Sequence, residues 1–215
     1  MLLLPSLMCA DFSRLGEEVD ELCAAGADGF HLDVIDGHFV RNFCIGLGDA
    51  SAICAHSSVP ADVHLAVEDA DSVFELFVRA GASIVYVHPE AERSINATLM
   101  HIARSGAHPG IAVAPGVSFA TVEMCLPLVD YVLVMTVNPG FPGQSYHAYV
   151  EPKIGQFASV RNRYGYKIVI DGAITEDVVP HLADLGADGV VLGSSSLFGK
   201  PEPYSVILNR LHAAC

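Results

Sequence analysis

Four residues of the chain have side chains that bind divalent metals and lie where short apolar segments end. His31 and Asp33 are two residues apart in segment 29–34, so on an extended strand their side chains point to the same side. His64 and Asp171 each lie at the end of another apolar segment. Any one of them alone could instead cap a helix or lie at the edge of the core. Together, two imidazoles and two carboxylates suit one Zn²⁺, Fe²⁺, Mn²⁺ or Co²⁺ ion, provided that the strands share a sheet.

The segments that carry these residues belong to a repeating pattern. Short apolar or β-branched runs recur about every 25 residues, each followed by a stretch with helical spacing. The predicted strands cover residues 2–8, 29–34, 61–67, 83–88, 109–114, 131–136, 166–171 and 188–193. Eight strand–helix units in 215 residues predict an α/β protein, a single (β/α)8 TIM barrel domain over residues 1–215. A doubly wound open sheet is the alternative, but it usually has fewer strands and a Gly-rich turn after the first strand, which this chain lacks.

A barrel of this kind collects the C-terminal ends of its strands at one mouth, where catalytic groups lie. The four candidate ligands come from the second, third and seventh predicted strands, so we expect all of them at that mouth. The long segment 36–47 follows the second strand and is a candidate lid. We expect His38 and His88 to contribute to a lid or a pocket wall rather than to bind the metal, and Asp36 to shape a turn.

Three glycine-bearing loops follow the last three predicted strands and could bind a phosphate group. They cover residues 138–145, 171–173 and 193–196 and include Gly140, Gly143, Gly172, Gly193 and Ser194. Barrels commonly bind phosphate on backbone N–H groups of such loops, because glycine lets the anion approach the amides closely. The loops contain no Lys or Arg, so neutral donors would hold the anion. The alternative is that these glycines only form tight turns.

The composition is that of a compact protein with an acidic surface. Hydrophobic residues make up 52% of the chain, and the formal net charge is −14. This charge repels polyanions, so we expect no nucleic-acid partner. No apolar run reaches the roughly 18 residues of a membrane span, so we expect a cytoplasmic protein with no membrane partner. The six cysteines are scattered without a Cys-x-x-Cys pair, and we expect them to be reduced thiols.

Several longer phrases of the chain are specific enough to indicate a family. They are Pro5-Ser6-Leu7-Met8-Cys9-Ala10-Asp11-Phe12, His31-Leu32-Asp33-Val34-Ile35-Asp36-Gly37-His38-Phe39-Val40, Asp62-Val63-His64-Leu65, Val134-Met135-Thr136-Val137-Asn138-Pro139-Gly140-Phe141 and Gly143-Gln144. On these phrases the chain resembles the ribulose-phosphate 3-epimerase family. The resemblance extends from Pro5 to about Phe198 and implies a (β/α)8 barrel that inverts carbon 3 of a phosphorylated ketose.

The resemblance also implies roles for individual residues. The metal ligands would be His31, Asp33, His64 and Asp171, and the two aspartates would also act as acid and base. Contacts to the sugar phosphate are expected from Ser6, His64, Met135, Gly140, Gly143, Gly172, Gly193 and Ser194. Because family members commonly form oligomers, a homo-oligomer is expected.

The predicted reaction needs two proton-transferring groups. Inverting a carbon next to a ketone requires removal of a C–H proton from one face and return of a proton to the other. Asp33 and Asp171 could flank the sugar, one ionised and one protonated, and exchange roles with the opposite epimer. A bound cation would stabilise the enediolate that forms between the two steps.

Two substrates fit the sequence. Asn138-Pro139-Gly140 and Gln144-Ser145 favour D-ribulose 5-phosphate, converted to D-xylulose 5-phosphate. The related D-allulose-6-phosphate 3-epimerases, which form D-fructose 6-phosphate, share the phrase Ser6-Leu7-Met8-Cys9, and Ala66 would make room for a longer sugar. The chain departs from the family pattern at Arg41, Ala66 and Ala173, which bears on substrate choice more than on chemistry.

Other reactions on the same barrel are less well supported. A Schiff-base aldolase needs a lysine at the C-terminal end of a strand, and none of the predicted strands ends in one. A catalytically silent barrel that only binds a sugar phosphate is a further alternative. It is disfavoured because the chain has both expected bases and both imidazoles.

Overall fold

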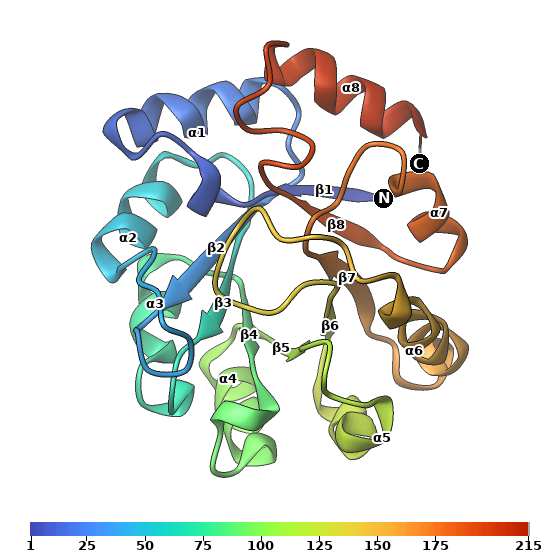
Figure 1. Ribbon diagram of the computed structural model, residues 1–215. Coiled ribbons are helices and arrows are strands. Elements are labelled where there is room, and N and C mark those ends of the chain that lie inside the picture. The colour runs from blue at the N-terminus through green and yellow to red at the C-terminus, as the bar shows by residue number, and fades with distance from the viewer. Residues whose placement is uncertain (215) are drawn as a thin grey trace.

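The computed structural model describes residues 1–214 and shows a ring of eight parallel strands surrounded by helices (Figure 1). The strands are β1 (Leu2–Pro5), β2 (Phe30–Ile35), β3 (Ala61–Ala66), β4 (Ile84–Val87), β5 (His108–Val113), β6 (Tyr131–Met135), β7 (Lys167–Asp171) and β8 (Gly189–Leu192). They are hydrogen-bonded in the order β1-β8-β7-β6-β5-β4-β3-β2. A parallel bridge between Ser6 and His31 joins β1 to β2 and nearly closes the ring. The predicted TIM barrel is confirmed.

Helices connect successive strands and form the outer layer in Figure 1. They are α1 (Leu15–Ala24), α2 (Leu47–His56), α3 (Phe74–Ala80), α4 (Ile95–Ser105), α5 (Phe119–Val122), α6 (Glu151–Tyr164), α7 (Val179–Asp184) and α8 (Tyr204–Ala214). The fifth helix is only one turn long and continues as a 3-10 helix that contains Pro127, because proline cannot donate the hydrogen bond that an α-helix needs. Among the described residues, no helix is both long enough and apolar enough to span a bilayer.

The strand boundaries agree with the sequence pattern to within one residue, except at the first strand. This strand ends at Pro5, and Leu7–Cys9 form a 3-10 turn in which Cys9 N donates to Ser6 O. The turn exists because the chain must leave the barrel wall at the mouth. It brings Ser6 to the mouth as a loop residue instead of the predicted strand residue, together with Cys9.

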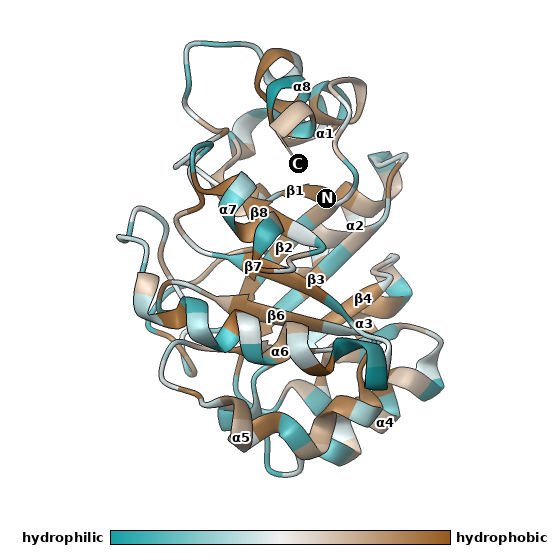
Figure 2. Cartoon of the chain, turned by 90° about the vertical axis from the view of Figure 1, so that its right-hand side faces the viewer, coloured by the Kyte–Doolittle hydropathy of each residue, from teal (hydrophilic) through white to brown (hydrophobic). Residues whose placement is uncertain are grey.

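The strands have two apolar faces, as a barrel between an inner core and a helix layer requires. Outward residues such as Leu32 and Val63 pack under the helices in the main core. A separate inner cluster fills the barrel and consists of Leu4, Tyr86, Ala112, Leu133, Val169 and Val191. Figure 2 shows the same division, with brown strands inside and mixed teal and brown helices outside.

Tyr86 is the largest side chain of the inner cluster, and it fits because Gly110 lies opposite on β5. A Cβ at Gly110 would lie 2.8 Å from Tyr86 Cε1 and closer still to Cδ1. We therefore expect Gly110→Ala to destabilise the protein by about 1–3 kcal/mol, the usual cost of overpacking. Thermal unfolding measures this effect. Gly116→Ala is the matched control, since a Cβ there would meet nothing within 4 Å, and equal unfolding midpoints for the two variants would contradict the packing argument.

Candidate metal centre and substrate pocket

The four predicted ligands converge at the C-terminal mouth of the barrel. One ligand atom from each of His31, Asp33, His64 and Asp171 lies within 4.8 Å of the ligand atoms of the other three. The strand register explains this convergence. Asp33 on β2 pairs directly with His64 on β3, and His31 lies two residues earlier on the same inward face. Asp171 is the last residue of β7, on the opposite side of the ring.

His31 is fully buried and has a carboxylate on each side. Its Nδ1 lies 2.7 Å from Asp62 Oδ1, and its Nε2 lies 3.5 Å from Asp33 Oδ1. Burial would lower the pKa of His31, but the charges of Asp62 and Asp33 raise it well above its usual range. A carboxylate beside Nδ1 favours a proton on that nitrogen and leaves Nε2 as the ligand atom. Since Nε2 is buried without a hydrogen-bond partner, the donor set fits a divalent cation that would compete with a proton for this nitrogen.

The two carboxyl groups of the cluster have different environments. Ser6 Oγ donates a 2.6 Å hydrogen bond to Asp33 Oδ2, and His64 Nδ1 lies 3.1 Å from Asp33 Oδ1. Burial would raise the pKa of Asp33, but His31 and His64 lower it well below the usual value. Burial raises the pKa of Asp171 to about 6, and the charge of Asp33 contributes to the increase. Two carboxyls whose environments move their pKa values apart are typical of an acid–base pair.

Of the other predicted mouth residues, Asp36, His38 and His88, only His88 differs from the expected role. Asp36 shapes its turn as predicted, because its side chain accepts hydrogen bonds from the backbone N–H groups of His38 and Phe39. The side chain of His38 is 73% exposed on the same loop. His88, however, is fully buried behind the pocket and forms no part of its wall. Its Nε2 lies 2.8 Å from His64 Nε2, and burial lowers the pKa of His88 to about 4, so this side chain is neutral.

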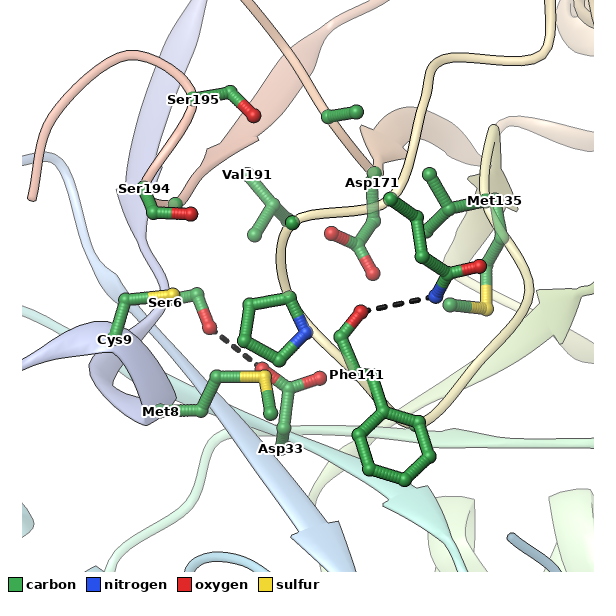
Figure 3. A pocket seen from close by; sticks show the side chains of 18 of the residues that line it. Ser6, Met8, Cys9, Asp33, Met135, Phe141, Asp171, Val191, Ser194 and Ser195 are labelled. Atoms are coloured by element: carbon green, nitrogen blue, oxygen red, sulfur yellow. Dashed lines mark hydrogen bonds between the residues drawn. The ribbon is translucent and has the colours of Figure 1, made fainter. Parts of the chain in front are cut away.

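A pocket opens beside the ligand cluster (Figure 3). Its wall contains the predicted substrate contacts Ser6, Met135, Gly140, Gly143, Gly172, Gly193 and Ser194, but not the buried His64. Asp33 and Asp171 point into it from opposite sides in Figure 3. In the described chain, its lining residues include no Lys or Arg. Any anion bound there would therefore meet backbone amides and hydroxyl groups.

Two loops that border the mouth are fixed by specific contacts. Asn42 Nδ2 donates a 2.6 Å hydrogen bond to Gly140 O, which ties the candidate lid to the loop after β6.

Gly172 has a φ of +120°, and a Cβ there would lie 2.8 Å from the Val137 backbone nitrogen. The next residue, Ala173, also has a positive φ of 53°. The family resemblance implies a second glycine at this position, and alanine there carries about 1–2 kcal/mol of left-handed strain.

Sequence reasoning missed two contributors to the site. The first is Asp62, although its spacing of two residues from His64 on one strand already places both side chains on the same face. The pairing of Asp62 with His31 depends on the register between β2 and β3, which the sequence does not specify. His88 was recognised as a mouth residue, but its contact with His64 depends on how β3 and β4 lie side by side.

The fold and this site define a TIM-barrel enzyme with a candidate metal centre at its mouth. The family model for the ribulose-phosphate 3-epimerase family matches residues 2–198. Over 221 aligned residues the chain is 41% identical to ribulose-phosphate 3-epimerase 1 of Cupriavidus necator, covering 99% of this chain and 91% of that protein. It is 37% identical to the ribulose-phosphate 3-epimerase of Bacillus subtilis, covering 92% of each. The chain therefore belongs to the ribulose-phosphate 3-epimerase family, and it is an isomerase of the epimerase type.

The barrel is also similar to solved structures of distant sequence. Phosphoribosyl anthranilate isomerase from Thermus thermophilus superimposes with a TM-score of 0.68 at 16% identity, covering 100% of this chain and 98% of that chain. At this identity the similarity concerns the fold alone.

Proposed function

We propose that the protein converts D-ribulose 5-phosphate to D-xylulose 5-phosphate by metal-dependent epimerisation at carbon 3. The observation that supports this most directly is the pair of carboxyl groups, Asp33 and Asp171, which face each other across the pocket with ligand atoms within 4.8 Å. Membership of the ribulose-phosphate 3-epimerase family supports the same reaction.

In the proposed reaction, Asp33 and Asp171 transfer protons on opposite faces of the sugar. The ionised carboxylate removes the C3 proton, and the protonated carboxyl group returns a proton to the other face. For the opposite epimer the roles exchange. The environments support this division, because Asp33 is held ionised by its neighbours while burial raises the pKa of Asp171 to about 6.

His31, Asp33, His64 and Asp171 would hold the divalent cation. When bound, the cation would stabilise the negative charge that develops on the substrate oxygens next to carbon 3. Asp62 would orient His31 through the 2.7 Å contact at Nδ1. Ser6 would orient Asp33 through its 2.6 Å hydrogen bond.

The phosphate group would bind at the far end of the pocket, on the loops after β7 and β8. Gly172 and Gly193 would offer backbone N–H groups there, and Ser194 a hydroxyl group. This assignment is supported by their common place in the lining of the pocket and by the absence of a Cβ at the two glycines.

The substrate is tested by comparing kcat/KM for D-ribulose 5-phosphate and D-allulose 6-phosphate on metal-replete protein. We expect a preference of at least about tenfold for the pentulose, equivalent to about 1.4 kcal/mol of transition-state binding. Ala66, whose small size would favour the longer sugar, is buried and does not line the pocket, so it offers that sugar no extra room. An equal or reversed preference would assign the protein to the hexulose phosphate.

A barrel that only binds a sugar phosphate is distinguished by isotope exchange. An active enzyme in D₂O incorporates deuterium at carbon 3 of the recovered sugar. A silent barrel leaves the C3 hydrogen in place.

A further inference from the structure

His64 has a different partner at each of its ring nitrogens. Its Nδ1 faces Asp33 Oδ1 at 3.1 Å, on the side of the candidate metal centre. Its Nε2 faces away from the metal centre and lies 2.8 Å from His88 Nε2. Two imidazole nitrogens at this distance share one hydrogen, so one ring must donate and the other accept. Which ring donates decides which His64 nitrogen has a free lone pair.

The surroundings of His88 determine the direction of this hydrogen bond. His88 is fully buried, and burial disfavours a charged ring, so only one of its two nitrogens carries a hydrogen. The other nitrogen, Nδ1, has Glu90 Oε1 as its charged neighbour at 3.7 Å. An ionised carboxylate can only accept, so it favours the hydrogen on Nδ1 of His88. His88 Nε2 is then an acceptor for a hydrogen on His64 Nε2. Without a metal, the Asp33 carboxylate 3.1 Å from His64 Nδ1 competes for the same hydrogen, whereas a cation held at Nδ1 would leave it on Nε2.

We propose that His88, with Glu90 near its Nδ1, is a positioning residue that keeps the hydrogen of His64 on Nε2 and thereby presents Nδ1 of His64 as the metal ligand. The inference rests on the proposed metal centre and extends it to a group outside the ligand set. The two histidine ligands would then bind the metal through different nitrogens, His31 through Nε2 and His64 through Nδ1. The reason is that Asp62 contacts Nδ1 of His31, whereas His88 contacts Nε2 of His64.

The hydrogen position is tested directly by NMR. The full-length protein is labelled with ¹⁵N-histidine and loaded with Zn²⁺, and long-range ¹H–¹⁵N correlations are recorded for the ring of His64. We expect a hydrogen on Nε2 and a metal-bound Nδ1. A hydrogen on Nδ1, or metal bound at Nε2, would overturn the proposal, and this measurement needs no variant to fold.

Metal affinity gives an independent test. Chelator-treated protein is titrated with Co²⁺ by calorimetry and by visible absorption. Loss of an outer-shell partner typically weakens metal binding 10–100-fold, so we expect an increase of about that size in Kd for His88→Leu. His88→Gln keeps an acceptor oxygen and is expected to recover most of the affinity. Unchanged affinity in His88→Leu, or no recovery in His88→Gln, would contradict the positioning role.

His38→Leu is the matched control, because it removes an exposed mouth histidine whose described polar contacts are with Asp36 of its own loop. Its Co²⁺ affinity is expected to equal that of the unmodified protein. The outcomes separate this inference from the proposed function. Normal Co²⁺ binding and the expected His64 tautomer without epimerase activity would remove the proposed reaction and leave the inference in place. If the unmodified protein binds neither Zn²⁺ nor Co²⁺, both the proposed function and this inference are overturned.

Discussion

Asp171→Asn is expected to lower epimerisation severely while leaving proton exchange on one face of the sugar intact. Removing one of two acid–base groups lowers kcat/KM by about 10²–10⁴-fold, since the amide can neither accept nor return the C3 proton. Asp33 still removes the proton from the epimer that it faces, so that epimer continues to exchange its C3 hydrogen with D₂O. Asp33→Asn is expected to give the complementary result with the other epimer. Mass spectrometry of recovered sugar measures both exchange reactions.

Two controls make this result specific. Asp36→Asn changes a carboxylate at the same mouth that holds a turn and does not line the pocket, so it is expected to retain activity within a few-fold. The metal content of each aspartate variant is measured as well, because both aspartates belong to the ligand cluster. Undiminished turnover in metal-loaded Asp171→Asn, or exchange lost from both epimers, would remove Asp171 from the proposed role.

Removal of divalent metal is expected to lower kcat by about 10³-fold or more. A cation at the reacting oxygens contributes several kcal/mol of charge stabilisation, and each 1.4 kcal/mol corresponds to about a factor of ten. Activity is expected to return on addition of Zn²⁺, Fe²⁺, Mn²⁺ or Co²⁺, because two imidazoles and two carboxylates accept all four ions.

The thermal unfolding midpoint distinguishes loss of the metal from loss of the folded structure. A ligand that binds the folded state at 100 times its Kd stabilises it by about 2.7 kcal/mol, so the chelated protein is expected to unfold at a lower temperature but still cooperatively. Full activity in protein shown to contain no divalent metal would overturn the metal dependence.

The barrel was predictable because its signals are local. Each strand is a short apolar run, and three helices end in closely similar Gly-Ala phrases. At these positions Gly26, Gly81 and Gly186 adopt the left-handed conformation with φ of 93°, 116° and 98°. The early end of β1 at Pro5 was not predictable. Leu7 and Met8 are apolar, and apolar residues are equally compatible with a continued strand and with a turn at the mouth.

The ligand cluster was predictable for a different reason. In a barrel the end of every strand lies at one mouth, so the position of Asp171 within its strand already implies its place in space. The residues that contact these metal ligands could not be predicted in the same way. Ser6, Asp62 and His88 contact their ligands through hydrogen bonds or short polar contacts whose geometry depends on side-chain rotamers and strand register. Neither quantity has a signature in a single sequence.

The pocket wall without Lys or Arg, set in a protein of net charge −14, has a kinetic meaning for the proposed substrate. A phosphate dianion approaches against the long-range field of the molecule, and no cationic funnel guides it inward. Its capture depends on short-range donors at glycine and serine, which act only after contact. The encounter rate is therefore set by substrate concentration and diffusion, and discrimination among phosphorylated sugars begins inside the mouth.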